Sequence, residues 1–334
     1  MKDIRNILED RKKRSVKTAV ILVSLLLAAA FISLYSGAAK IGLFEPLNVM
    51  SRQILYMRLF RIMLAVLVGG GLSVAGVILQ GLLRNPLCEP YVLGISSGAS
   101  VGAVLSIVLG AGGMFAGLGV LPLWAFAGAA VTFFAVYRTA EVSGRVPMQN
   151  LLLTGVIAGA LLSSIVIFIV SFSQQDALHS IIWWLLGNLQ IFDGGLLVFV
   201  AVMVVAGTAA AYIFSNELNA FALGEEEAAH IGVDTERMKM VLFLTASMIT
   251  GAAVSAAGMI GFVGLIVPHF MRMVVGPDHK ILIPSSFLAG GIFLLVCDTA
   301  ARALMPPAEI PVGVITAVFG APFFIRMLRK KSRL

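Results

Sequence analysis

Apolar runs of about 20 residues recur along the chain, the length with which an α-helix crosses a bilayer, whereas barrel strands alternate over about 10 residues. Short polar segments separate these runs. The pattern predicts an all-α polytopic membrane protein with about ten transmembrane helices. The predicted spans are 16–36, 62–83, 91–110, 118–137, 151–172, 196–213, 240–257, 259–275, 283–304 and 311–328. The shorter apolar segment 177–192 carries Trp183 and Trp184 and predicts an interfacial helix.

One polar stretch, 216–239, interrupts this pattern. It predicts two short helices, 217–223 and 225–231, with Gly224 ending the first and Gly232 capping the second. Two interpretations stay open on this pattern alone. The pair is either a rigid element on which a soluble partner acts, or a solvated loop with incidental helix.

Composition supports the membrane assignment and a single domain, 1–334. Of the 334 residues, 59% are hydrophobic and 12% are charged, and the mean hydropathy is +1.00. Soluble globular domains have a far more polar composition. Cys88 and Cys297 lie at opposite ends of different spans, so we expect them to be packing residues.

Basic residues orient the chain in the membrane. If both termini are cytoplasmic, all but five of the 24 Lys and Arg residues lie on the inner side, as the positive-inside rule requires. The five outer ones are Lys40, Arg52, Arg58, Arg61 and Arg302. The net charge of +7 is thus explained by topology, and no nucleic-acid partner is expected.

Several predicted spans carry small residues four positions apart, a pattern that lets helices approach closely. Close helix packing is a sufficient explanation of all of them. These stripes are Ala65, Gly69 and Ser73; Gly155, Gly159 and Ser163; Ser247, Gly251 and Ser255; and Gly313, Ala317 and Ala321.

No catalytic or metal-binding motif is present in the sequence. It contains no Walker A loop and no His-Glu-x-x-His pair, so we expect that the chain is not an enzyme and that any ATP hydrolysis occurs on separate subunits. The four histidines show no ligand spacing, and no metal site or cofactor is expected. Ionisable residues are rare inside the spans, which argues against a proton-coupled carrier.

Three arginines at the predicted outer side could form a basic patch. Arg58 and Arg61 are one turn apart, and Asp298 lies four residues before Arg302, where the two can form an ion pair. Such a patch would suit acidic residues of an extracytoplasmic partner, whose carboxylates guanidinium groups bind bidentately. Anchoring in lipid headgroups and an ion pair at the helix end are the alternatives.

The turn after the second span, 80–99, contains Pro86 and Pro90 followed by Ser and Gly residues. Either a gate or a tight chain reversal explains this composition.

Eight segments in order resemble, over nearly the whole chain, the permease family of ABC importers for ferric siderophores, haem and cobalamin. They are Arg58–Arg61 (RLFR), Gln80–Leu87 (QGLLRNPL), Leu93–Ala99 (LGISSGA), Leu151–Val156 (LLLTGV), Trp184–Gly187 (WLLG), Leu223–Val233 (LGEEEAAHIGV), Gly258–His269 (GMIGFVGLIVPH) and Glu309–Pro322 (EIPVGVITAVFGAP).

The resemblance implies a subunit of the cytoplasmic (inner) membrane that pairs with a second copy or a close relative. Two ATPase subunits and an extracytoplasmic binding protein complete the importer. The helix pair at 217–232 then corresponds to the family's coupling helices. The implied ATPase-coupling residues are Leu223, Gly224, Glu225, Glu226, Ala228, Ala229 and Gly232.

The resemblance also implies that Arg58, Arg61 and Arg302 meet glutamates of the binding protein. The implied cytoplasmic gate comprises Asn85, Leu87, Met148 and Gln149. At the second gate position some members have smaller hydroxyl residues where this chain has Met148, Gln149 and Asn150.

Substrate and mechanism leave alternatives. A ferric siderophore or another iron complex is the expected cargo, with haem or cobalamin as alternatives. A secondary carrier that works without an ATPase is the alternative from another class, and a membrane enzyme is disfavoured because no catalytic constellation can be assembled.

Overall fold

Seven long apolar helices form most of the computed structural model, which describes residues 2–37, 49–111, 113–115, 118–190, 192–306 and 308–331. Each is long and apolar enough to span a membrane. They are α1 (Lys2–Tyr35, apolar from Val16), α2 (Val49–Leu82), α4 (Val120–Ala140), α5 (Met148–Ser171), α7 (Gly194–Ile213), α10 (Thr235–Ala257) and α12 (His279–Ala303).

Shorter elements connect and complete this helical bundle. The shorter apolar helices are α3 (Ile95–Val108), α11 (Val263–Val275) and α13 (Val312–Lys331). The remaining elements are the 3₁₀ helix η1 (Pro90–Leu93), α6 (Gln175–Leu185), α8 (Ser215–Leu223), α9 (Glu225–His230) and the two-residue antiparallel strands β1 (Met114–Phe115) and β2 (Leu118–Gly119), in which Met114 pairs with Gly119.

The all-α polytopic fold is confirmed. A helix occupies each predicted span, but seven of them pass the length and hydropathy test by themselves, so the count of ten stays a prediction. Two boundaries differ from expectation. Helix α2 begins at Val49 rather than near 62, because three arginines and Gln53 lower the hydropathy of its first turns. Helix α6 ends at Leu185, since Gly187 adopts a positive φ of 81°.

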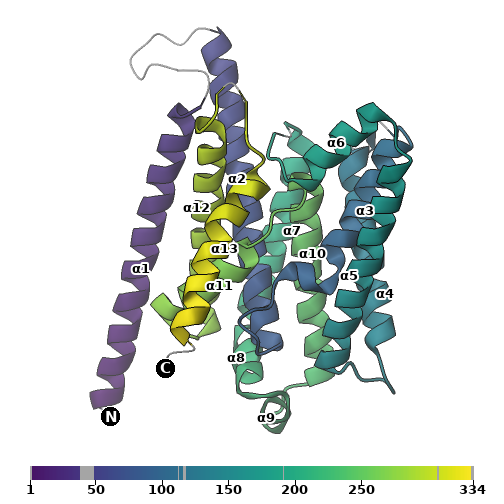
Figure 1. The fold of residues 1–334 in the computed structure, drawn as a ribbon. Helices are drawn as coiled ribbons and strands as arrows, with labels where there is room; N and C mark the ends of the chain where they lie inside the picture. Colours follow the sequence, from purple (N-terminus) through teal and green to yellow (C-terminus); the bar gives the residue numbers. More distant parts are fainter. Residues whose placement is uncertain are drawn as a thin grey trace.

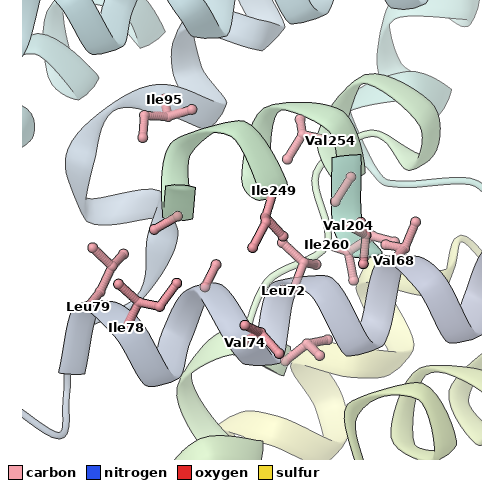
Figure 2. Packing of buried hydrophobic residues seen from close by; sticks show 14 of the residues in the cluster. Val68, Leu72, Val74, Ile78, Leu79, Ile95, Val204, Ile249, Val254 and Ile260 are labelled. Carbon is pink, nitrogen blue, oxygen red and sulfur yellow. The ribbon is translucent and has the colours of Figure 1, made fainter. Parts of the chain in front are cut away.

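Helices α2 and α10 form the interior of the bundle. Figure 1 shows α2 near the centre, with α1 at one edge and α4 and α5 toward the opposite edge. Figure 2 shows Val68, Leu72 and Ile78 of α2 near Ile249 and Val254 of α10, and these residues are fully buried. By contrast, few residues are buried in α5 and in the apolar part of α1 that begins at Val16, as expected for helices that face lipid or a partner.

Glycines bring the central helices into close contact. A Cβ atom added at Gly76 of α2 would lie 1.9 Å from the carbonyl oxygen of Gly264 in α11, and one at Gly69 would lie 2.3 Å from that of Gly290 in α12. The predicted stripe on α2 is therefore a helix-packing surface. Gly313 is equally confined, since its Cβ would lie 2.4 Å from the oxygen of Leu186.

Both ends of the chain lie toward the same end of the bundle. Figure 1 places the first turns of α1 and the last turns of α13 toward the end that carries α8 and α9, while α6 lies at the opposite end. This arrangement agrees with an even number of spans. The assignment of that end to the cytoplasm stays a prediction, and Lys40 and Arg333 of the predicted charge pattern lie outside the described residues.

Candidate functional site

The polar stretch forms two short helices at one end of the bundle (Figure 1). Helix α8 ends at Leu223 and α9 covers Glu225–His230, as predicted to within two residues. Gly224 joins them with φ 146° and Gly232 follows α9 with φ 97°. The N–H of Gly232 donates to Ala229 and that of Val233 to Ala228, the bond pattern of a Schellman cap. Both glycines thus have the conformational role that the sequence predicts.

Helix α8 is fixed to the bundle through an apolar face and a polar contact. Leu218 and Phe221 are buried in the core. Asn219 donates from Nδ2 to Oδ1 of Asp278 at 3.0 Å and accepts from the backbone N–H of His279 at 3.0 Å. The Asn219 side chain thereby connects α8 to the start of α12.

The opposite side of the helix pair is bare and partly apolar. Leu223 is 63% exposed and Ile231 is 65% exposed, and Ala229 and Glu226 are exposed as well. Two residues attach α9 to the bundle. Ala228 is buried against it, and Glu225 Oε1 lies 2.8 Å from Nζ of Lys239. Among the predicted coupling residues, Gly224 and Ala228 are therefore structural, while Leu223, Glu226, Ala229 and Gly232 are accessible.

The three predicted docking arginines converge at the other end of the bundle. Arg61 holds Asp298 through two nitrogens, with Nε 2.8 Å and Nη2 2.7 Å from Oδ1. Its Nη1 lies 2.9 Å from Oε2 of Glu309. Arg302 contacts Oδ2 of Asp298 at 3.2 Å, which confirms the predicted i,i+4 pair. Arg58 donates to the carbonyl of Leu34 at 2.8 Å.

This arginine cluster (Arg58, Arg61 and Arg302) is buried, unlike the accessible patch that the sequence predicts. Asp298 is 0% exposed, and all three arginines are buried. The last turn of α1 covers them, because Arg302 donates to the carbonyl oxygens of Ser33 and Ser36. Sequence reasoning missed both ion pairs of Arg61, because Asp298 lies 237 residues and Glu309 lies 248 residues from it along the chain. A docking role for the arginines stays a prediction.

Glu309 lies in the loop between α12 and α13. Burial alone would raise the pKa of this carboxyl group, but the neighbouring Arg61 guanidinium outweighs burial and lowers it. The Glu309 carboxylate also accepts a hydrogen bond from the side chain of Gln190. The ion pair therefore ties the α12–α13 loop to α2, and the hydrogen bond from Gln190 ties it to the segment after α6.

The predicted gate residues lie in two separate segments. Asn85 Oδ1 accepts from the backbone N–H of Leu87 at 3.0 Å and so stabilises the turn after α2. Leu87 is exposed. Met148 and Gln149 begin α5 directly after Pro147. No hydrogen bond joins the two segments within the described ranges, and their role as a gate stays a prediction.

The segment between α2 and α3 also makes a buried contact with the start of α11 that was not predicted. The N–H of Phe262 donates to Oε1 of Glu89 at 2.6 Å, and that of Ile260 donates to the hydroxyl of Tyr91. Phe262 has a positive φ of 70°, a strained conformation for a side-chain-bearing residue. These two hydrogen bonds connect the α2–α3 turn to the start of α11.

Glu89 should make the stability of the protein depend on pH. Burial raises the pKa of its carboxyl group from 4.5 to about 7, although the Phe262 hydrogen bond partly offsets burial. The folded state therefore binds a proton more tightly than the unfolded state. The resulting stabilisation is complete below the unfolded-state pKa and is lost as the pH rises through the folded-state pKa, from about 4.5 to about 7.

The measurement is the midpoint of thermal unfolding in detergent between pH 4.5 and pH 8, for the wild type and Glu89→Gln. The difference between the two proteins isolates Glu89 from the other titrating groups. We expect the wild type to lose stability relative to the variant as the pH rises. Parallel pH curves for the two proteins would contradict the prediction.

Comparison with known proteins identifies the family. The model of the FecCD transport family matches residues 25–330. The cobalamin import system permease protein BtuC of Halobacterium salinarum is 43% identical over 298 residues, which cover 89% of this chain and 78% of that protein. The Fe(3+)-citrate import system permease protein YfmE of Bacillus subtilis is 34% identical, with 97% of this chain and 98% of that protein covered.

A solved structure agrees with these sequence matches. It is described as an inward-facing conformation of a metal-chelate type ABC transporter. The TM-score is 0.85 and the identity 32%, and the match covers 94% of this chain and 99% of that one. The FecCD match spans the helix pair, the arginine cluster and both predicted gate segments. The chain therefore belongs to the FecCD transport family of ABC importer permeases.

Proposed function

We propose that this permease subunit pairs with a second copy of itself in the cytoplasmic (inner) membrane, with both termini in the cytoplasm. Two ATPase subunits bind the α8–α9 end, and an extracytoplasmic binding protein delivers cargo to the opposite end. ATP hydrolysis takes place on the ATPase subunits. ATP binding closes the two ATPases, which moves the α8–α9 pair as a rigid unit, so that the pathway opens alternately to each side.

The α8–α9 pair carries this proposal. One side is fixed to α12 and α10 through Asn219 and Glu225, and the other presents exposed apolar side chains such as Leu223 and Ile231. An exposed apolar surface with a polar surround is typical of a protein-binding site. A rigid element with a free apolar side can receive a push from an ATPase and pass it to the bundle.

We also propose that the binding protein docks over the arginine cluster, although all three arginines are buried in the free subunit. The guanidinium groups are fixed by Asp298, Glu309 and carbonyl groups of α1, so their positions are set before a partner arrives. Fixed charges favour association because less side-chain entropy is lost on binding. A carboxylate of the binding protein reaches these guanidinium groups only if the end of α1, whose carbonyl groups now bind Arg58 and Arg302, moves aside.

The cargo that we propose is a metal chelate, with a ferric siderophore or another iron complex as the first candidate. The similarity to the iron-citrate permease over nearly both whole chains supports this. Cobalamin is the second candidate, because the permease with 43% identity imports cobalamin by name. Haem is the further alternative.

Uptake by cells that lack this subunit tests the proposal. Labelled ferric siderophore, haem and cobalamin are supplied with and without the restored subunit, its ATPase and its binding protein. We expect uptake of one ligand, which an ATPase without hydrolytic activity abolishes. Uptake that continues without a working ATPase would instead indicate a secondary carrier.

The substitution Leu223→Glu should abolish ATP-driven uptake without unfolding the chain. Leu223 is 63% exposed, so a charge there costs little in the free subunit but would be desolvated against an ATPase. We expect at least a tenfold loss of ATPase copurification. A tenfold loss of affinity corresponds to about 1.4 kcal/mol, and burying an unpaired charge costs more than that.

Leu223→Ala is the matched control, since it removes the same side chain without adding charge. It should retain most of the ATPase. Normal copurification of the ATPase with Leu223→Glu would show that this surface does not bind it.

A further inference from the structure

Lys239 is a charged residue sealed inside the inner end of the bundle. It lies on α10, and its side chain is 1% exposed. Its Nζ donates to the carbonyl of Val146 at 3.0 Å, to Oε1 of Glu225 at 2.8 Å and to Oε1 of Glu236. A lysine ammonium group has three donors, so all three are used. The charge tolerates burial because two carboxylates neutralise it.

The three acceptors belong to different structural elements. Glu225 is the first residue of α9, Glu236 lies one turn from Lys239 on α10, and Val146 closes the turn between α4 and α5. The N–H of Val146 also donates to Oε2 of Glu236 at 3.0 Å. Both backbone groups of Val146 are therefore held by this Lys239 hub (Lys239, Glu225, Glu236 and Val146).

The turn that the hub holds is itself rigid. Val142 and Arg145 exchange backbone hydrogen bonds of 2.8 and 3.1 Å. Ser143 and Gly144 between them both have positive φ, 52° and 78°, the geometry of a tight I′ hairpin turn. Only Pro147, whose φ is fixed by its ring, separates Val146 from the first residue of α5. A displacement of Val146 therefore moves Met148 and Gln149 by a similar amount.

Separating α9 from Lys239 costs free energy, because it breaks the contact between Glu225 and the Lys239 ammonium group. A movement of α9 that left Lys239 behind would deprive a buried ammonium group of one of its two carboxylates. Glu236 would still neutralise the charge and Glu225 is half-exposed, so the cost is moderate rather than that of a fully buried pair. The Glu225 side chain is 42% exposed, so the connection to α9 reaches the surface that the ATPase is proposed to contact.

We propose that Lys239 is a positioning residue that transmits the movement of α9 to the start of α5. This inference rests on the proposed ATPase coupling and deepens it. The chain of contacts runs from Glu225 through Lys239 to Val146 and then through Pro147 to the predicted gate residues. Two points along α5 and α9 that are distant in sequence thereby move together.

The first test needs no partner and so is independent of the proposed function. Hydrogen exchange of residues 142–150 is measured in the isolated permease in lipid nanodiscs. Glu225→Gln, which removes the charge that links α9 to Lys239, should accelerate exchange there about fivefold, the effect of roughly 1 kcal/mol for a half-exposed charged hydrogen bond.

Glu227→Gln is the matched control, because Glu227 is an exposed residue of the same helix and undergoes the same loss of charge. It should leave exchange of residues 142–150 unchanged. Equal exchange in wild type and Glu225→Gln would overturn the inference, whatever the protein transports.

The second test separates transmission from a purely structural role. In the permease reconstituted with its ATPase and binding protein, Lys239→Met should retain ATP hydrolysis while cargo uptake per ATP falls at least fivefold. If Lys239→Met does not fold, Glu236→Gln serves in its place, because Glu236 belongs to the hub but not to the predicted ATPase-coupling residues. Uptake per ATP at the wild-type level in a variant whose 142–150 exchange is accelerated would refute transmission through the hub.

Discussion

The substitution Asp298→Asn is expected to lower the free energy of unfolding by about 3–5 kcal/mol, the usual effect of removing one member of a buried ion pair. Asp298 is fully buried and neutralises Arg61 and Arg302 at once. Asparagine has the same shape but no charge, and its amide group would face guanidinium donors. The measurement is the midpoint of thermal unfolding of the purified subunit in detergent.

Glu141→Gln is the control for this substitution. It removes a carboxylate from an ion pair with Arg138, whose side chain is 80% exposed, and exposed pairs contribute about 0–1 kcal/mol. We expect a clear fall in the unfolding midpoint for Asp298→Asn and almost none for Glu141→Gln. Equal midpoints for the two variants would show that the cluster does not stabilise the fold.

The substitution Gly76→Ala should disrupt the contact between α2 and α11. The added Cβ would lie 1.9 Å from a backbone oxygen and 2.7 Å from a backbone carbon of Gly264. Rotation of a side chain cannot relieve a clash with backbone, so one helix must shift. We expect a loss of about 3 kcal/mol or more, at the upper end for overpacked sites, measured as a lower unfolding midpoint and a lower yield of folded subunit.

Gly194→Ala provides the comparison. Gly194 begins α7 and has open space where its Cβ would lie, so the same chemical change should leave stability within about 0.5 kcal/mol. A Gly76→Ala protein as stable as Gly194→Ala would mean that α2 and α11 separate easily. The glycine would then serve movement rather than packing.

Local patterns predicted much of the architecture. The apolar runs predict the positions of the helices, and Gly224 and Gly232 predict where α8 and α9 end, because such signals depend on neighbouring residues. The small-residue stripe on α2 predicts close packing correctly, but it does not reveal which helix is the neighbour. That neighbour is α12 at Gly290.

Contacts between distant residues could not be predicted. Lys239 reads as an inner basic residue that orients the chain, yet it is buried among acceptors from three elements. The arginine cluster reads as exposed because Glu309 and the end of α1 are far from it in sequence. In each instance the sequence shows the charge, and only the tertiary fold shows its partner.

Helix α12 has a consequence for communication across the membrane. Its first residue, His279, contacts Asn219 of α8, and near its last turn Asp298 holds Arg61 and Arg302. At 1.5 Å per residue, this one 25-residue helix joins points about 30 Å apart. Tilting such a strut displaces both of its ends at once. If the binding protein and the ATPase dock at the two ends as proposed, α12 would couple their binding mechanically without any relay of side chains between them.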